Sequence, residues 1–292
     1  ADGNLIVSKI EKKQRKRQPS APFITSTLQQ EAIRKLGFTA QRTMRTAQQL
    51  YEGIDTGEGA VGLITYMRTD SVTLAKEALD EIRDYIGKTY GKENLPKEPN
   101  QYKTKSKNAQ EAHEAVRPTS AFRTPKDLKP HLSTEQYKLY GLIWKRAIAC
   151  QMIHATLDTV GVDLSAGVGN VFRATGSTVR EKGFMAVYQE GQDDVKPESD
   201  ERILPALEEG DKVPLKLIRP EQHFTEPPPR YTEASLVKTL EEYGIGRPST
   251  YANIISTLRN REYVEVDSKR FIPSEVGRVV NKFLTDHFTN YV

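Results

Sequence analysis

The chain changes its hydrophobic pattern twice, and this change limits the folds that are open to it. Residues 4 to 24 alternate weakly and end at APFIT, which is typical of a strand that leaves one module for another. Residues 27 to 153 favour helices, whereas residues 157 to 218 return to short branched or aromatic segments between Gly-rich and acidic turns. We expect the opening strand to pair with this later β region. The helical block would then be an insertion, with two adjacent crossings that form a hinge.

We therefore predict an α+β multidomain fold for the 292 residues. Residues 1–26 and 155–218 would form a β hinge module, and residues 27–154 would form the inserted, mainly helical module. Residues 219–292 would form a C-terminal helical module. The length allows two or three domains, each with its own core.

Capping signals divide the helical block into separate helices. STLQQEAIRKLGF predicts a helix capped at Ser26 or Thr27 that stops at Gly37, and a second helix follows from about Thr39 to Tyr51. A longer helix is predicted from Ser133 to Met152, with Ser133 and Gln136 as its capping box.

Composition excludes several classes of protein. No apolar run approaches the roughly 20 residues that a membrane helix needs. The single cysteine, Cys150, excludes a disulfide framework and a Cys-rich zinc site. The polar start has no apolar stretch of the kind that a signal peptide carries, and it reads like a start in mid-protein. We expect a cytoplasmic protein.

The net charge of +4 does not by itself indicate nucleic-acid binding, but its distribution is uneven. A basic run occupies the opening strand, and an acidic run lies near residues 190 to 201. The basic run either follows phosphates or is a solvated strand, and the charge pattern leaves both open. Its residues are Lys9, Lys12, Lys13, Arg15, Lys16 and Arg17.

The stretch GLITYMRTDS, residues 62 to 71, places Tyr66 and Arg68 two positions apart. VGLITY predicts a strand that ends near Tyr66, and Asp70 or Ser71 is expected to cap the helix that follows. Arg68 and Thr69 would then lie at a helix entry, which favours an anion. A tyrosine phenol becomes a nucleophile when nearby positive charge favours its phenolate, and an arginine fork can hold two phosphate oxygens. The local pattern alone leaves open whether Tyr66 packs in a core or attacks a phosphate.

A second candidate is His113 in NAQEAHEAVRP, which is helix-compatible over residues 108 to 117. On a helix, Arg117 would lie one turn away on the same face. His113 could donate to a phosphate oxygen or relay a proton, or it could be an ordinary surface or capping group. HEAVR lacks the second histidine of a metalloprotease helix.

The C-terminal region predicts a helix-turn-helix followed by a two-stranded wing, a common plan for binding nucleic acid. Its turn, GIGRPST, contains Arg247, which could reach a phosphate, and Ser249 or Thr250, which could cap the second helix. The glycine spacing matches neither a dinucleotide fingerprint nor a P-loop.

Four stretches together carry a specific resemblance. They are PFITSTLQQEA, GLITYMRTDS, NAQEAHEAVRPT and HFTEPPPRYTEASLVKTLEEYGIGRPSTYA. In this order they resemble the type IA DNA topoisomerases of bacteria, and the similarity runs from about Asn4 to the end of the chain.

The resemblance assigns roles to particular residues. Tyr66 matches the nucleophile that breaks one DNA strand and becomes esterified to its 5′ end. Arg68 matches the arginine beside the scissile phosphate, and His113 matches the active-site histidine. The residues expected to contact the DNA strand, or to support those contacts, are Gln48, Thr65, Thr69, Asp70, Arg247, Thr250 and Arg261.

The resemblance also implies a reaction and its partners. Single-strand breakage, strand passage and rejoining would relax negatively supercoiled DNA without ATP, and the β hinge module would be a moving arch. The family begins with a Toprim domain whose acidic DxDxE cluster holds Mg²⁺, and neither that cluster nor cysteine-based zinc modules are found here. The resemblance therefore predicts a fragment that has no metal site of its own and does not relax DNA alone. Its expected partners are single-stranded DNA and the missing Toprim domain.

Two other classes remain as alternatives. A tyrosine recombinase or type IB topoisomerase also combines arginines and a histidine with a tyrosine, but its tyrosine follows them, whereas Tyr66 precedes His113 and Arg247. A non-catalytic DNA-binding protein built on the C-terminal winged helix is the other alternative.

Overall fold

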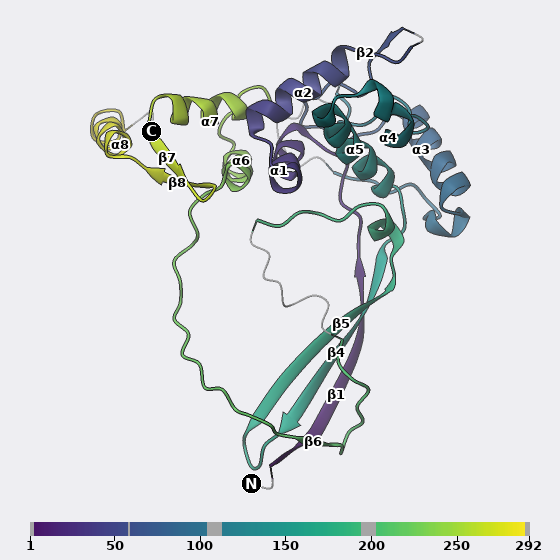
Figure 1. Ribbon diagram of the computed structural model, residues 1–292, viewed down its shortest axis with the longest axis vertical. Coiled ribbons are helices and arrows are strands. Elements are labelled where there is room, and N and C mark those ends of the chain that lie inside the picture. The colour runs from purple at the N-terminus through teal and green to yellow at the C-terminus, as the bar shows by residue number, and fades with distance from the viewer. Residues whose placement is uncertain (1–2, 58, 104–112, 194–202, 290–292) are drawn as a thin grey trace. The chain divides into compact units, whose positions relative to one another are not determined.

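A computed structural model describes residues 3–57, 59–103, 113–193 and 203–289 (Figure 1). The described residues form two compact units. One unit draws on Ala1–Pro19, Ile153–Ala186 and Asp194–Pro228, and the other on Ser20–Met152, Val187–Asp193 and Pro229–Val292. We call the first the β unit and the second the helical unit.

The β unit is built on a four-stranded antiparallel sheet in the order β5-β4-β1-β6. The opening strand pairs with β4 from Ile6 opposite Ser165 to Arg17 opposite Ala155, and the helical block lies between these two strands in the sequence. A bulge interrupts the register between Val7 and Lys9. The strands are β1 (Asn4–Arg17), β4 (Ala155–Ser165), β5 (Val171–Glu181) and β6 (Lys212–Pro214), and the short helix η3 (Gly183–Ala186) follows β5.

The helical unit begins with two helices in the predicted places, but the predicted cap of the first one is wrong. That helix begins at Thr25 and its N-cap is Ile24 rather than Ser26 or Thr27, because the Thr27 hydroxyl lies within the first turn and accepts from the N–H of Ile24 at 3.0 Å. The first helix ends at Gly37, which takes the left-handed conformation with φ of 66° that a glycine adopts without strain. Ser133 caps α5 and forms a capping box with Gln136. The elements are α1 (Thr25–Leu36), α2 (Ala40–Glu52), β2 (Ile54–Asp55), β3 (Ala60–Val61), α3 (Lys76–Thr89), η1 (Lys92–Asn94), α4 (Pro125–Leu128), η2 (Lys129–His131) and α5 (Thr134–Ala149).

The C-terminal part of the helical unit contains the predicted helix-turn-helix and wing. The turn of the wing passes through Ser268 and Lys269, both with positive φ. The elements are α6 (Glu233–Glu242), α7 (Tyr251–Asn260), β7 (Val264–Asp267), β8 (Arg270–Pro273) and α8 (Glu275–His287). The sequence-based boundary at residue 219 differs from the grouping seen here, because α6 and α7 share a core with Ala40 of α2 and Ile33 of α1.

Three local predictions around Tyr66 are wrong. The strand that VGLITY predicts is limited to Ala60–Val61, and beyond it Ile64 forms only an isolated bridge with Pro118. The next helix begins at Lys76 rather than beside Asp70 or Ser71, so Arg68 and Thr69 do not lie at a helix entry.

The third wrong prediction is the helix over residues 108 to 117. His113 to Arg117 are not helical, and Val116 bridges Phe23. The earlier residues of that stretch lie outside the described ranges. The reason for the difference is tertiary, because Val116 and Arg117 exchange backbone hydrogen bonds with residues 23 and 65 instead of with their own neighbours.

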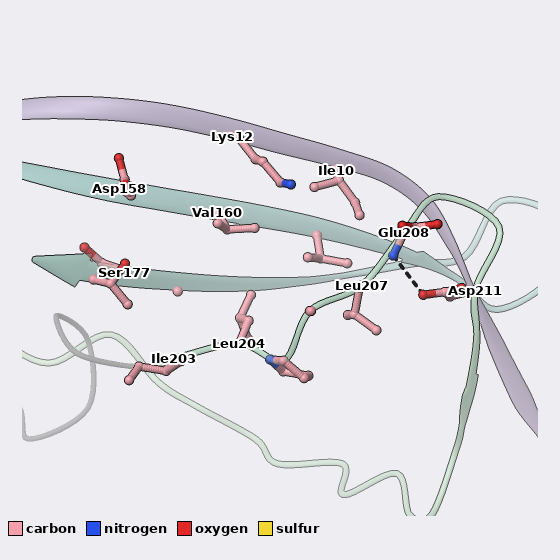
Figure 2. A pocket seen from close by; sticks show the side chains of 15 residues that line it. Ile10, Lys12, Asp158, Val160, Ser177, Ile203, Leu204, Leu207, Glu208 and Asp211 are labelled. Atoms are coloured by element: carbon pink, nitrogen blue, oxygen red, sulfur yellow. Dashed lines mark hydrogen bonds between the residues drawn. The ribbon is translucent and has the colours of Figure 1, made fainter. Parts of the chain in front are cut away.

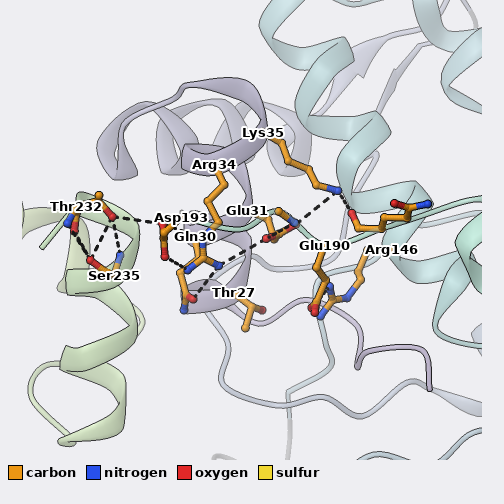
Figure 3. A network of polar contacts seen from close by, with 12 residues as sticks. Thr27, Gln30, Glu31, Arg34, Lys35, Arg146, Glu190, Asp193, Thr232 and Ser235 are labelled. Atoms are coloured by element: carbon orange, nitrogen blue, oxygen red, sulfur yellow. Dashed lines mark hydrogen bonds and ion pairs between the residues drawn. The ribbon is translucent and has the colours of Figure 1, made fainter. Parts of the chain in front are cut away.

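A segment that we call the strap, Val187–Asp193, is attached to α1 and α5 by a polar network (Figure 3). Glu31 of α1 is buried and accepts hydrogen bonds from the Tyr188 hydroxyl and from the backbone N–H of Gly191, at 3.0 Å in the latter case. The carboxylate of Asp193 accepts hydrogen bonds from Nε and Nη2 of Arg34, at 3.1 and 2.6 Å. The strap therefore belongs to the helical unit although it lies in the sequence between two stretches of the β unit.

None of the described helices combines the length and the apolar character that crossing a membrane requires.

Candidate active site

Tyr66 lies on an extended segment whose backbone is fixed at several points. The N–H of Leu63 donates to the carbonyl of Leu50 at the end of α2, at 2.8 Å. The N–H of Thr65 donates to the carbonyl of Arg117, at 2.9 Å. Backbone groups that are bonded to remote parts of the chain cannot shift independently, so the segment is a rigid support for its side chains.

Burial alternates along this segment. Met67 and Thr69 are buried, whereas Tyr66 is 40% exposed and Arg68 is also exposed. The chain bends at Met67 and Arg68. The side chains of Tyr66 and Arg68 are therefore both open to solvent two residues apart, and the possibility that Tyr66 fills a core is excluded.

Thr69 lies beneath the site. It is only 2% exposed, and its hydroxyl accepts a hydrogen bond from the N–H of Ser71 at 3.0 Å. Its backbone N–H and carbonyl both bond to Thr25 at the start of α1, with N–H to Oγ1 at 2.9 Å. Because its polar groups already have partners, Thr69 supports the conformation of the tyrosine segment.

Thr65 supports the segment in a similar way. Its hydroxyl donates to the carbonyl of Ala115 at 2.7 Å and accepts from the N–H of Arg117 at 3.0 Å. These bonds connect the tyrosine segment to the residues that follow His113.

The ring of Tyr66 contacts two other rings. Its centroid is 5.4 Å from that of Tyr51 and 6.1 Å from that of His113, and both pairs are edge-to-face. Within the described part of the chain the Tyr66 hydroxyl forms no hydrogen bond, so it is free to meet a ligand. The structure thus brings the predicted nucleophile and the predicted histidine together.

Arg117 differs from the expectation that it shares a helical face with His113. Its guanidinium group pairs with Glu114, with Nε and Nη2 at 2.9 and 2.6 Å from the carboxylate. The other oxygen of Glu114 accepts from the N–H of Ala75, the N-cap of α3. Arg117 is therefore neutralised, whereas Arg68 forms no ion pair with any described residue.

Gln48 lies on α2, three residues before Tyr51 and thus on the same helical face. Its amide donates to Glu52 at 2.6 Å. The end of α2 therefore gathers polar and aromatic groups beside the tyrosine segment.

Arg247 and Thr250 form the turn that enters α7. The hydroxyl of Thr250 accepts from the N–H of Arg247 at 2.8 Å, and it caps this turn rather than the helix, because no side-chain bond to the helix is present. The Arg247 guanidinium group donates to the carbonyl of Gly246 and has no acidic partner among the described residues. Arg261 is the C-cap of α7 and is exposed.

The phenol of Tyr251, the first residue of α7, has a raised pKa. Burial is the main cause, the negative charges of Glu241 and Asp70 act in the same direction, and Arg247 acts in the opposite direction. Arg261 lies at the other end of α7, about 15 Å further along the helix, and no contact links it to Tyr66.

Sequence reasoning missed Tyr51. Its position three residues after Gln48, at the end of a predicted helix that leads into the tyrosine segment, is a signal in retrospect. The periodicity could not show which of the tyrosines would approach Tyr66.

A groove lies in the β unit and does not contain the candidate residues (Figure 2). It measures about 620 Å³ and lies between the sheet and the segment 203–211, where Val160 and Leu207 line it. Within the described ranges, no group of three or more His, Cys, Asp or Glu side chains could hold a metal ion.

Comparisons with known proteins agree with this picture. A family model described as DNA topoisomerase matches residues 1–292. The DNA topoisomerase 1 of Xylella fastidiosa (strain 9a5c) is 62% identical over all of this chain and 36% of its own length. That of Rickettsia bellii is 58% identical over 99% of this chain and 36% of its own length.

Among solved structures, full-length topoisomerase I from Thermotoga maritima is similar with a TM-score of 0.85 and 39% identity. The match covers 98% of this chain and 46% of that one. The mixed α/β fold is thus that of a type IA topoisomerase. The chain spans only about 36% of the length of the curated relatives.

Proposed function

Since the chain belongs to the bacterial DNA topoisomerase family, we propose that it supplies the tyrosine-bearing part of a type IA enzyme. That enzyme would break one DNA strand, pass another through the gap and reseal the break without ATP. Relaxation of negatively supercoiled DNA would be the result, in the cytoplasm.

The proposed nucleophile is Tyr66. Its phenol loses its proton as the oxygen attacks the scissile phosphorus, and the bond from phosphorus to the 3′ oxygen of the preceding nucleotide breaks. That oxygen takes up one proton and leaves as a 3′-hydroxyl, so the exchange consumes no net proton. The 5′ phosphate remains esterified to Tyr66. Resealing is the reverse attack, and because the ester keeps the bond energy, no nucleotide cofactor is needed.

The observation that carries this proposal is the exposure of both Tyr66 and Arg68 on a rigid segment, with the ring of His113 6.1 Å from the tyrosine ring. Arg68 would hold two oxygens of the scissile phosphate, because its fork has no acidic partner among the described residues. His113 would position a phosphate oxygen. Gln48, Asp70, Arg247, Thr250 and Arg261 would contact the strand around it, and Thr69 would support them.

The finer division of the fold belongs to the same proposal. The β unit would be the arch on which the inserted helical part moves, and the winged-helix part would bind single-stranded DNA. Both would act together with a Toprim domain in the complete polypeptide.

The family implies Mg²⁺, and the described residues of this chain do not fit that ion, because no acidic cluster is present among them. Its ligands would lie in the Toprim domain. The chain alone would therefore fail to relax DNA, and robust Mg²⁺-dependent relaxation of a supercoiled plasmid by the 292-residue chain would contradict this.

The proposal is tested by replacing Tyr66 with Phe in the complete protein. Plasmid relaxation should disappear because the attacking oxygen is gone. The matched control is Tyr231→Phe, since Tyr231 is exposed to a similar degree, and it should keep wild-type relaxation. Relaxation that survives Tyr66→Phe would refute the assignment.

A further inference from the structure

Resting on the proposed function, we propose that Tyr51 is a positioning residue for the nucleophile, which it holds through its ring. Tyr51 is not among the residues that the sequence suggested. Both rings are exposed to the same degree, 41% for Tyr51 and 40% for Tyr66, and they lie 5.4 Å apart with an interplanar angle of 63°. This edge-to-face geometry is the one that aromatic pairs prefer.

The approach of the two rings is built into the backbone. A side chain at Gly62 would place its Cβ 2.8 Å from the carbonyl oxygen of Tyr51, so only glycine allows the tyrosine segment to come this close to the end of α2. The hydrogen bond from Leu63 to Leu50 lies directly beside this contact. The short hairpin β2–β3 closes the connection between them, with Ile54 paired with Val61.

Aromatic contacts are what restrict the Tyr66 ring. Its hydroxyl has no hydrogen-bond partner in the described ranges, so no polar bond there limits rotation about its side-chain torsions. The rings of Tyr51 and His113 both contact the Tyr66 ring and limit the directions in which it can turn. A reacting atom displaced by about 1 Å can lose on the order of 100-fold in rate, so removing one of the two walls should slow the attack.

The ring of Tyr51 carries this role, and its hydroxyl does not. No hydrogen bond from that hydroxyl to a described residue is present. Phenylalanine should therefore replace tyrosine here, whereas alanine should not. This pattern distinguishes positioning from acid–base chemistry by Tyr51 itself.

The chain offers a matched control. Phe122 is 44% exposed and also forms an edge-to-face pair, with its centroid 5.4 Å from that of Tyr85. Phe122→Ala removes an equally exposed aromatic wall that does not face the nucleophile.

The experiment uses the complete protein and a single-stranded oligonucleotide with a labelled 5′ end. The cleavage rate is measured in a single turnover at saturating oligonucleotide, and the Kd is measured in a Tyr66→Phe background in which no cleavage occurs. Tyr51→Ala should cleave at least tenfold more slowly with a Kd within threefold of the parent. Tyr51→Phe and Phe122→Ala should stay within twofold of the wild-type rate.

Three results would overturn the inference. They are a Tyr51→Ala rate within twofold of wild type, a Tyr51→Phe rate as low as that of Tyr51→Ala, and a Kd that rises as much as the rate falls. If Tyr51→Ala does not fold, Tyr51→Leu keeps apolar bulk and should still be at least fivefold slower. Absence of any covalent adduct in the wild type would instead refute the proposed function.

Discussion

Two arginines of the helical unit, Arg146 and Arg68, lie in opposite environments. Beside the strap, Arg146 has a side chain only 5% exposed and pairs with Glu190 at 2.8 Å (Figure 3). It also donates to the carbonyl of Ala21 at 2.6 Å and lies over the ring of Phe23. Beside Tyr66, Arg68 is exposed and has no acidic partner among the described residues.

The difference teaches how to separate structural from functional charge. A buried guanidinium group must be paired, because an isolated charge is costly to bury, and its partners then consume its donors. An exposed group without a partner keeps its five donors for a phosphate. Residue type alone does not distinguish Arg68 from Arg146, whereas the contacts do.

The largest effect on stability is expected from Arg146→Ala. The change removes the bonds to Glu190 and to the carbonyl of Ala21 and the packing on Phe23. Because Glu190 is partly exposed and can be solvated, we expect the low end of the range for broken buried pairs, about 3 kcal/mol. Urea unfolding of the chain measures this, and a loss below about 1 kcal/mol would remove the contrast with Arg68.

Arg68→Ala should have the opposite profile. In the complete protein it should lower the rate of strand cleavage by about 100-fold, as the loss of a donor to developing phosphate charge does. The free energy of unfolding should change by less than about 0.5 kcal/mol, because the side chain is exposed and unpaired. A stability loss as large as that of Arg146→Ala would show that Arg68 is structural.

Asp193→Asn tests the strap at its more exposed end. Asp193 holds Arg34 through two bonds and lies 3.4 Å from the hydroxyl of Thr232, the N-cap of α6. The ion pair is partly solvated, so its removal should cost about 1 kcal/mol in urea unfolding. The loss should shrink in high salt, and a salt-independent loss would argue against an electrostatic role.

Arg247→Ala and Arg261→Ala should each weaken binding of single-stranded DNA by a few fold. Each removes about one phosphate contact, so the slope of log K against log salt should become shallower by about 0.7. Arg259→Ala on the same helix is the control, because Arg259 is already paired with Glu233 at 3.2 Å. If all three variants had equal slopes, the presence of an acidic partner would not distinguish the arginines that contact DNA from those that do not.

The smallest expected effect is that the thiol of Cys150 does not react in the folded chain. Burial raises the pKa of its thiol to about 12, and the thiol donates to the carbonyl of Ala147 at 3.0 Å. A raised pKa keeps the thiolate scarce in the folded chain, so this group contributes stability below about pH 9 that is lost as the pH rises toward 12. Alkylation by iodoacetamide at pH 8 should require unfolding, and rapid labelling of the native chain would show that Cys150 is accessible.

Sequence patterns predicted the parts of the fold that local rules determine. Gly37 and Ser133 mark helix ends through their own conformation and hydrogen bonds, and the inserted helical block followed from the two changes of period. The winged helix followed from the same rules.

The conformation of the tyrosine segment could not be predicted from local rules, because residues far away in the sequence determine it. Thr25 and Arg117 supply the hydrogen-bond partners that hold residues 65 to 69 in place without a regular strand or helix. The start of α3 is similar, since the acceptor for Ala75 comes from Glu114, 39 residues away. Periodicity cannot detect a bond between positions so far apart.

The candidate site divides in the same way. Tyr66, Arg68 and His113 were singled out by motif, and the structure adds which of them are exposed and which rings are adjacent. Tyr51 required the structure, because only the fold brings the end of α2 against Gly62.

Mass spectrometry of the trapped DNA adduct tests the central claim most directly. The complete protein would be incubated with a single-stranded oligonucleotide, denatured during turnover, and digested with nuclease and protease. We predict a nucleotide attached through its 5′ phosphate to the phenolic oxygen of Tyr66. An adduct on another residue or on a 3′ phosphate, or no adduct from a preparation that relaxes plasmid DNA, would contradict the account.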